Sequence, residues 1–350
     1  MSDPTNPLHL SLRDVAREAG VSTATVDRVL HDRPGVRKET IRRVRETIER
    51  IGFHPNAAAA ELARGQSHHF CFVLPRNLNF FMTELMENIE KMRSSLGARR
   101  VRTEIVKTDV FDPDALVETL DGLAGRCDGV AVVALDHPKV RDAIDRLVAQ
   151  DTIVVTLVSD APTSRRTRYV GIDNVAAGRT SGTLLGRFVG RRTEGKVAVV
   201  VGSLSLRDHV ERLFGISQVI SGDFPKLQML PAVEGRDNDD LNYELTRKLL
   251  AEHPDLVGLY NIGAGTAGIG NALSESGRAS EVVFVAHDVT PQTRRFLEDG
   301  VVDAVISQNP GHEARSAIRV LMALRRNESI IAEQEQIGVD IVIKDNLPIG

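Results

Sequence analysis

Apolar and polar positions follow two different repeats along the chain, and the repeat changes near residue 65. Between Leu12 and Gly52 the apolar residues recur at the spacing of an amphipathic helix. Beyond residue 67, short runs rich in Val, Ile and Leu alternate with helical segments. The pattern therefore predicts a small helical N-terminal domain and a large second domain of alternating strands and helices.

Stop signals divide the N-terminal segment into three short helices. The first covers residues 14–19, and Gly20 follows it where a left-handed residue is favoured. Ser22 is a good N-cap for a second helix over residues 23–30, because its hydroxyl can accept a bond from an amide of the first turn. A turn then leads to a third helix over residues 38–51. Two helices joined by a tight Gly-containing turn are typical of a helix-turn-helix, whose second helix enters the DNA major groove.

The face of the second helix that points away from the apolar stripe predicts contacts with DNA. Arg28 suits a bidentate contact to guanine, which discriminates against a wrong base by about 1–3 kcal/mol. Thr23 and Ala24 suit thymine methyl groups or base edges. Other polar side chains suit phosphate contacts, which set the register without reading sequence: Ser11, Ser22, Thr25 and Arg37. A helical bundle without a DNA partner is the alternative.

Residues 10–67, LSLRDVAREAGVSTATVDRVLHDRPGVRKETIRRVRETIERIGFHPNAAAAELARGQS, resemble without gaps the DNA-binding head and hinge of lac repressor (LacI/GalR) family regulators. The resemblance implies a hinge helix over residues 55–63 that folds on DNA, pairs with its dimer mate and wedges into the minor groove. Its contacting positions hold Asn56, Ala59 and Leu62, with Leu62 as the apolar lever. Asp27 stands where many members carry Ser, so it either accepts a proton from cytosine N4 or pairs with Arg28.

The distribution of charge favours a nucleic-acid partner for the N-terminal domain only. The 350 residues carry a net charge of -4, which argues against an unspecific nucleic-acid binder. Between Arg13 and His54, however, ten Arg or Lys residues stand against seven Asp or Glu residues. A basic head therefore precedes an acidic body.

The cysteines and the hydropathy indicate a reducing compartment and no membrane. Cys71 and Cys127 lie far apart inside apolar stretches, with the spacing of neither a disulfide framework nor a metal site, so we expect buried thiols and no metal. The N-terminal run lacks the basic start and apolar segment of a secretory signal. No stretch approaches the roughly 20 apolar residues that span a bilayer. We therefore expect a cytoplasmic protein.

Eight apolar runs predict the strands of the second domain: FCFVL, VRTEIV, GVAVVAL, TIVVTLV, KVAVVVG, LVGLYNI, VVFVAHD and DAVISQ. Their alternation with amphipathic helices is typical of doubly wound parallel sheets, and eight strands exceed one such unit. We therefore predict an all-α helix-turn-helix head followed by two α/β lobes, each a doubly wound parallel sheet. Such sheets bind ligands at the carboxyl ends of their strands, which would face each other across a cleft.

Two phosphate-binding motifs are tempting in this domain, and we reject both. GAGTAG at residues 263–268 fits a dinucleotide loop with Asp288 about 20 residues further on, but it lies in the third strand–helix unit of its lobe. Close helix packing is the better account of its glycines. Residues 190–196 nearly match a P-loop, but Val197 replaces the magnesium-binding Ser or Thr and the run precedes a strand. We expect neither enzyme activity nor a cofactor, and a nicotinamide-dependent enzyme is the alternative.

The resemblance to the lac repressor family continues to near the C-terminus, most closely to members with a core similar to periplasmic ribose-type sugar-binding proteins. It implies that Phe80 and Phe81 stack on the apolar side of a sugar while Asn79 binds a hydroxyl. It also places further polar side chains around the cleft: Asp160, Arg212, Asn261, Asp288 and Gln308, with Glu234 and Arg236 as supplements. Around Asp160 the run VSDAP departs from the aspartate–arginine pair expected there.

Together these observations divide the chain into a DNA-binding head (1–54), a hinge helix and linker (55–67) and a two-lobed domain (68–350). Lobe one takes about 68–172 and 309–335, and lobe two about 173–308 and 336–350. We expect a transcription repressor, a homodimer or tetramer on pseudo-palindromic operator DNA, controlled allosterically by a sugar or polyol. A sugar sensor without a DNA role is the alternative, and a purine-type corepressor is the rival effector.

Overall fold

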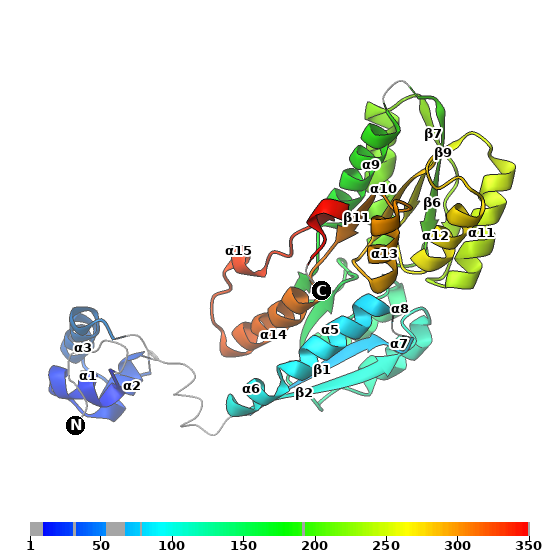
Figure 1. Cartoon of the computed structure of the whole chain (residues 1–350). Coiled ribbons are helices and arrows are strands. Elements are labelled where there is room, and N and C mark those ends of the chain that lie inside the picture. Colours follow the sequence, from blue (N-terminus) through cyan, green and yellow to red (C-terminus); the bar gives the residue numbers. More distant parts are fainter. Residues whose placement is uncertain (1–9, 31–32, 54–66, 78, 191–192, 349–350) are drawn as a thin grey trace. The chain divides into compact units, whose positions relative to one another are not determined.

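The computed structural model describes residues 10–30, 33–53, 67–77, 79–190 and 193–348, and it separates into two compact units, Met1–Ser67 and His68–Gly350 (Figure 1). The described part of the first unit holds helices α1 (Leu12–Ala19), α2 (Thr23–Leu30) and α3 (Lys38–Ile51). The predicted bounds of α2 and α3 are confirmed. Helix α1 begins two residues earlier than predicted, because both the amide and the hydroxyl of Ser11 donate to the Asp14 carboxylate and fix the first turn.

An apolar core holds the three helices of the head together. Val15, Val26 and Val44, one from each helix, are fully buried in it. The predicted N-cap of α2 is confirmed, since the Ser22 hydroxyl oxygen accepts a hydrogen bond from the Thr25 amide at 3.1 Å. The apolar stripes read from the sequence therefore close one miniature core, and the remaining helix faces stay exposed.

The second unit begins with a five-stranded, all-parallel sheet in the order β2-β1-β3-β4-β5. Its strands are β1 (His68–Pro75), β2 (Val101–Thr108), β3 (Gly129–Val132), β4 (Ile153–Leu157) and β5 (Arg168–Val170). Its helices are α5 (Phe80–Lys91), α6 (Arg93–Ala98), α7 (Pro113–Asp121), α8 (Pro138–Ala149) and α14 (Pro310–Arg326). Helix α14 comes from much later in the chain and packs on α5, β3 and β4 (Figure 1).

A seven-stranded sheet forms the second lobe, in the order β12-β11-β10-β9-β6-β7 with β8 also paired to β6. Its strands are β6 (Gly195–Val201), β7 (Leu227–Met229), β8 (Val233–Glu234), β9 (Leu256–Asn261), β10 (Val283–His287), β11 (Ala304–Ser307) and β12 (Asp340–Val342). Its helices are α9 (Asn174–Val189), α10 (Arg207–Asp223), α11 (Asp239–Glu252), α12 (Thr266–Glu275) and α13 (Pro291–Asp299), with the 3-10 turn η2 (Lys344–Asn346) beside α13. The short helix α15 (Ala332–Glu335) packs on α14 of the first lobe. Only β12 runs antiparallel to its partner among the described strands.

Both faces of the central strands of the first sheet are buried, which explains why β1 and β3 read as continuous apolar runs. Phe70 and Phe72 on β1 join one apolar cluster, whereas Cys71 and Val73 join the cluster on the opposite face. The predicted architecture of two parallel-sheet lobes is thus confirmed. The short strands β5, β7, β8 and β12 are additions that the pattern of apolar runs did not predict.

Candidate functional site

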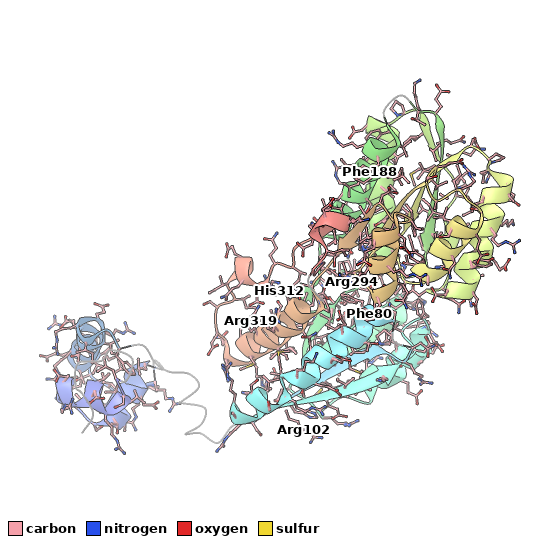
Figure 2. All side chains as sticks on the ribbon, viewed as in Figure 1. Phe80, Arg102, Phe188, Arg294, His312 and Arg319 are labelled. Atoms are coloured by element: carbon pink, nitrogen blue, oxygen red, sulfur yellow. The ribbon has the colours of Figure 1, made fainter. Side chains whose placement is uncertain are left out.

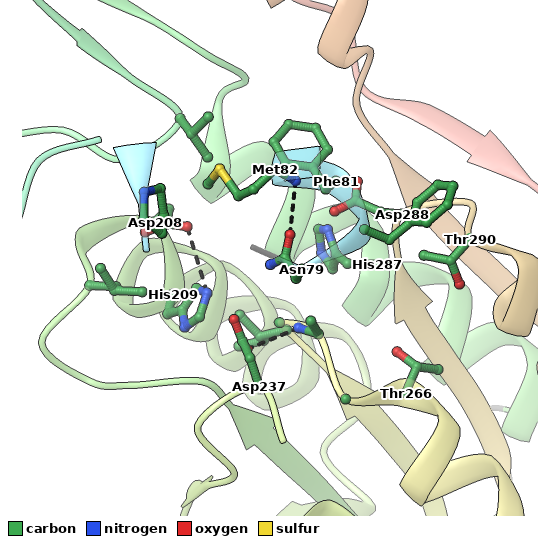
Figure 3. A pocket seen from close by; sticks show the side chains of 18 of the residues that line it. Asn79, Phe81, Met82, Asp208, His209, Asp237, Thr266, His287, Asp288 and Thr290 are labelled. Carbon is green, nitrogen blue, oxygen red and sulfur yellow. Dashed lines mark hydrogen bonds and ion pairs between the residues drawn. The ribbon is translucent and has the colours of Figure 1, made fainter. Parts of the chain in front are cut away.

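A cleft of about 260 Å³ opens between the two lobes, where the carboxyl ends of their strands face each other. The first lobe contributes mainly apolar side chains: Phe80, Phe81, Met82, Val110, Phe111, Val133 and Val158. The second lobe contributes mainly polar ones: Asp208, His209, Arg212, Asp237, Thr266, His287, Asp288 and Gln308. Figure 3 shows Phe81 and Met82 across the cleft from Asp237 and Thr266. A ligand would therefore meet one apolar and one polar wall.

Three predicted residues come together at the start of α5. Asn79 is the N-cap of this helix, and its Oδ1 accepts a hydrogen bond from the Met82 amide at 2.9 Å (Figure 3). That bond leaves the Asn79 NH2 group as the donor available to a ligand. Phe81 is 6% exposed, whereas Phe80 is 39% exposed (Figure 2). Both rings line the cleft, and Phe80 can be covered further by a ligand.

Arg212 on α10 is buried at the base of the cleft and held from two sides. Its Nε donates to Oδ1 of Asn174 at 2.8 Å, and its Nη1 donates to the Ile262 carbonyl at 3.0 Å. Its Nη2 has no hydrogen-bond partner among the described residues. Burial disfavours the charge of Arg212, but the carboxylates of Asp208 and Asp288 raise its pKa, so it stays a cation.

Asp288 and Gln308 form the predicted polar pair at the ends of β10 and β11. Burial raises the pKa of Asp288 to about 6, against the lowering effects of the Arg212 charge and of hydrogen bonds from Gln308. Oδ1 of Asp288 and Oε1 of Gln308 are buried acceptors without a partner among the described residues. Buried polar atoms normally have a partner, so these two acceptors and the Arg212 donor indicate where a ligand with hydroxyl groups would bind.

Asp160 does not line the cleft, although the resemblance placed it there. Its two carboxylate oxygens accept hydrogen bonds from Nε and Nη2 of Arg166, both at 2.6 Å, and from the Thr156 hydroxyl at 2.5 Å. The residues at the end of β4 that line the cleft are Val158, with a φ of 64°, and Ser159. Asp160 therefore pairs with an arginine of its own loop, outside the cleft, and Val158 and Ser159 face the cleft in its place.

Asn261 acts on the cleft indirectly. Its Nδ2 donates to the carbonyls of Gly263 and Ala264 and to the hydroxyl of Thr266, at 2.9–3.1 Å. It is fully buried and is absent from the residues that line the cleft. Its role is to fold the loop before α12, whose residues form part of the polar wall. The supplementary candidates lie outside the lining as well, and Glu234 accepts a hydrogen bond from the Leu204 amide at 2.6 Å.

The sequence reasoning missed several polar lining residues, among them Asp208, His209, Asp237 and His287. Asp237 lies in a loop where it has a φ of 54°, and its Oδ1 accepts a hydrogen bond from the Ala264 amide at 3.0 Å. Nε2 of His287 lies 2.5 Å from the Tyr260 hydroxyl, and burial lowers the pKa of this imidazole well below its usual value. His287 directly precedes Asp288 at a strand end, a signal that could have found it. Asp237 carries no such local signal.

The glycines of GAGTAG are explained by packing. A Cβ on Gly268 would lie 1.9 Å from the Asp239 carbonyl oxygen, and one on Gly265 would lie 2.3 Å from Nδ2 of Asn242. Helices α11 and α12 therefore approach each other more closely than a side chain permits. This geometry supports the packing interpretation of the motif over a dinucleotide site.

The predicted DNA-contacting face of the head is accessible to a partner. Exposed side chains on it are Ser11, Ser22, Thr23, Ala24, Arg28 and Arg37, while Thr25 and Asp27 are half-buried. Asp27 forms an ion pair with Arg33 at 3.3 Å, an arrangement that the sequence analysis did not consider. The predicted hinge residues Asn56, Ala59 and Leu62 lie outside the described residues. No helix among the described ranges is long and apolar enough to cross a membrane.

Comparison with known proteins places both units. Residues 70–329 match the periplasmic binding protein domain, and residues 11–56 match bacterial regulatory proteins of the lacI family. Catabolite control protein A of Priestia megaterium is 43% identical over 83 residues, 24% of this chain and only 25% of that relative. Its namesake in Staphylococcus aureus (strain MRSA252) is 22% identical over 249 residues, 71% of this chain and 72% of the relative. The crystal structure of GanP, a glucose-galactose binding protein from Geobacillus stearothermophilus, superposes with a TM-score of 0.74 at 22% identity, covering 81% of this chain and 100% of GanP.

Proposed function

The chain belongs to the periplasmic binding protein family through residues 70–329 and carries a lacI-family regulatory domain at residues 11–56, and we propose that it is a transcription repressor controlled by a small sugar or polyol. The observation that carries the proposal is the cleft itself. It has an apolar wall, a polar wall and several buried polar atoms without partners among the described residues, including those on Arg212, Asp288 and Gln308. The same chain carries an N-terminal helical unit, and its second helix, α2, exposes the side chains that we propose contact DNA bases.

The two walls of the cleft suit a carbohydrate. A sugar ring has an apolar C–H face, which the exposed Phe80 ring can cover, and hydroxyl groups that both donate and accept hydrogen bonds. Arg212 supplies a donor, and Asp288 and Gln308 supply acceptors. GanP, which shares the fold, is named for binding glucose and galactose. We therefore infer a neutral sugar or polyol rather than a purine, which would require larger stacking surfaces in a chain without Trp.

Control of DNA binding follows from coupling between the two units. Binding between the lobes changes their relative angle, and the linker that follows the head transmits this change to the hinge. Coupling of this kind is reciprocal and typically amounts to about 1–3 kcal/mol. We infer a dimer on a pseudo-palindromic operator, since each head reads one half-site, and a cytoplasmic protein without catalytic activity.

Selection from a random pool of DNA duplexes, followed by footprinting at moderate salt, tests this proposal. We expect the full chain to protect an inverted repeat, and a chain lacking residues 1–65 to lose that protection while it keeps sugar binding. A full chain that protects no repeat but binds a sugar would be a sensor without a DNA role. A thermal-shift panel that responds to nicotinamide dinucleotides and to no sugar would favour the enzyme alternative.

A further inference from the structure

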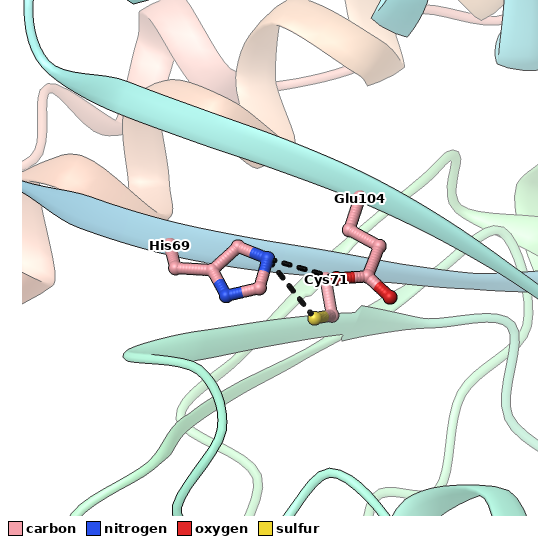
Figure 4. Close-up of side chains that lie close together, drawn as sticks. All are labelled: His69, Cys71 and Glu104. Atoms are coloured by element: carbon pink, nitrogen blue, oxygen red, sulfur yellow. Dashed lines mark hydrogen bonds and ion pairs between the residues drawn. The ribbon is translucent and has the colours of Figure 1, made fainter.

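His69, Cys71 and Glu104 meet at the start of the first sheet, at the opposite end of β1 from the cleft (Figure 4). Their ligand atoms, an imidazole nitrogen, a thiol sulfur and a carboxylate oxygen, all lie within 4.8 Å of one another. The sequence gives no metal-binding spacing here, because pairing between strands brings the residues together. The proposed effector site does not use any of the three.

The register between β1 and β2 explains why His69, Cys71 and Glu104 lie close together. In the parallel pair of β1 and β2, Cys71 is the partner of Glu104, and His69 precedes Cys71 by two residues. Residues two apart on a strand point to the same face of the sheet. Cys71 is fully buried, whereas the side chains of His69 and Glu104 retain 21% and 28% exposure. An ion could therefore reach the cluster from solvent.

The imidazole of His69 is oriented as it is in metal sites. Its Nδ1 lies 3.0 Å from the Arg126 carbonyl oxygen, which can only accept, so Nδ1 carries the proton. Nε2 then turns to Oε2 of Glu104 at 3.1 Å and to Sγ of Cys71 at 3.9 Å. A backbone carbonyl that fixes the tautomer in this way is the usual outer partner of a metal-binding histidine. A neutral Nε2 and a carboxylate oxygen at this separation need a cation between them, either a proton or a metal ion.

The separations of the three donor atoms fit a metal ion. Cys127, which precedes β3, stays outside this group, and its Sγ lies 3.8 Å from the Leu123 carbonyl oxygen. Bonds of about 2.0–2.3 Å to a tetrahedral zinc ion place the donor atoms roughly 3.3–3.8 Å apart. The separations of 3.1 and 3.9 Å from Nε2 lie close to that range, so side-chain rotations of a few tenths of an ångström would suffice.

We propose that His69, Cys71 and Glu104 form a site for a borderline-soft divalent cation, with Zn²⁺ as the best match to one thiolate, one imidazole and one carboxylate. Zinc sites with three protein ligands keep a fourth position open. Binding releases one proton from the Cys71 thiol as the sulfur–metal bond forms. Arg126 and Arg102 contact Glu104 at 3.5 and 4.0 Å. The arginines oppose a dication, and the thiolate and the Glu104 carboxylate offset that effect.

The position of this cation site gives it a structural consequence. His69 is the second residue of the second unit, directly after the linker enters it. A bound ion would tie β1 to β2, the edge strand that carries the exposed Arg102 (Figure 2).

Cobalt titration of the reduced, chelator-treated full chain tests the site, because Co²⁺ bound by thiolates absorbs in the near ultraviolet. We expect this band to saturate at one ion per chain and to disappear when Zn²⁺ displaces the cobalt. Cys71→Ser should abolish the band. His69→Gln and Glu104→Gln should weaken binding at least about tenfold. The matched control is His253→Gln, which changes a half-buried imidazole near Lys196 in the second sheet and should leave the titration unchanged.

Two results would overturn the proposal. One is a wild-type chain that shows no thiolate-to-cobalt band, which would leave His69 and Glu104 as a simple ion pair. The other is a band that survives both His69→Gln and Glu104→Gln, which would mean adventitious binding elsewhere. Glu104 is partly exposed, so Glu104→Gln should fold even if Cys71→Ser does not. The melting temperature of Glu104→Gln, measured with and without Zn²⁺, then tests the site. Zn²⁺ should raise the melting temperature of the wild type more than that of this variant.

Discussion

Nε of Arg212 donates a hydrogen bond to Oδ1 of Asn174 at 2.8 Å, and this contact joins α10 to α9 beneath the cleft. With Nη1 bound to the Ile262 carbonyl, the guanidinium is fixed in orientation before any ligand arrives. A donor that is already held loses little conformational entropy when a ligand binds. The remaining Nη2 group is thus a preorganised contact for the effector.

Arg212→Lys should weaken effector binding about 10- to 100-fold, because a lysine keeps the charge but cannot satisfy Asn174, Ile262 and a ligand from one planar group. Isothermal titration with the best sugar from the panel measures this loss. Arg207→Lys, on the same helix but outside the cleft lining, should bind as the wild type does. Equal affinities for the two variants would mean that Arg212 does not touch the effector.

Stability of the ligand-free protein should fall as the pH rises through about 6, the raised pKa of Asp288. A carboxyl whose folded pKa exceeds its unfolded value binds more protons when folded, so its contribution is complete in acid and is lost as pH increases. A shift from 3.8 to about 6 corresponds to about 3 kcal/mol. Burial also raises the pKa of Glu313 on α14, which adds a contribution of the same sign.

The variant Asp288→Asn isolates the part of this pH dependence that is due to the Asp288 carboxyl. Asn tolerates the left-handed backbone that Asp288 adopts, with a φ of 59°, so the loop should keep its shape. Urea unfolding should show the variant gaining stability relative to the wild type between pH 4.5 and pH 7.5. Parallel pH profiles for the two proteins would show that Asp288 titrates normally.

Variants at Phe80 and Phe81 should have different effects, one on sugar affinity and the other on the stability of the fold. Phe80 is 39% exposed in the cleft, so Phe80→Ala should lower sugar affinity about tenfold with little effect on melting temperature. Phe81 is 6% exposed within the core cluster, so Phe81→Ala should destabilise the fold by about 3–5 kcal/mol. Calorimetry and sugar titration of both variants check this. Unchanged sugar affinity of Phe80→Ala would show that the Phe80 ring does not stack on the sugar.

Gly268→Ala should destabilise the second lobe. The added methyl group would lie 1.9 Å from the Asp239 carbonyl oxygen, so α11 and α12 would have to move apart. Gly222→Ala is the matched control, since no atom lies within 4 Å of its added Cβ. In a helix interior that change should be neutral or stabilise by up to about 1 kcal/mol. Thermal unfolding compares the two variants, and equal melting temperatures would contradict the packing account of the glycine motif.

Arg28→Ala should reduce affinity for the selected operator by about 1–3 kcal/mol and relax specificity at one base pair. Arg28 is exposed on α2, so the fold of the head should not change. Arg42→Ala on α3 removes an equally exposed arginine, which pairs with Glu46 at 3.8 Å, and should affect binding less. Binding measured over a series of mutated duplexes distinguishes lost readout from a general loss of charge.

Local chemistry explains how much of the fold the sequence could predict. Ser22 and Gly20 act within their own turns, so the start of α2 and the end of α1 follow from single residues. Strands such as β3 follow from burial on both faces, which leaves a continuous apolar run, whereas the edge strand β2 is only partly buried. Strands such as β8, which is only two residues long, carry no run and form because β6 provides a partner.

The cleft shows where such inference ends. The apolar pattern locates the strand ends and the helix that carry Arg212, Asp288 and Gln308, but the family resemblance was needed to select these three side chains. The resemblance placed Asp160 at the cleft, but its carboxylate is bound by Arg166 away from the lining, a contact that depends on the fold of the loop. Asp237 depends on left-handed backbone in a loop and on nearby glycines, which no apolar period encodes.

We propose that the affinity of the head for DNA depends on whether a sugar occupies the cleft. The most direct test is the dissociation constant of the full chain and its selected operator, measured by fluorescence anisotropy at fixed salt with and without a saturating sugar. We predict a change of about 5- to 150-fold, the usual range of allosteric coupling, and its loss in Arg212→Lys at the same sugar concentration. An identical dissociation constant in the presence of a sugar that demonstrably occupies the cleft would contradict the account.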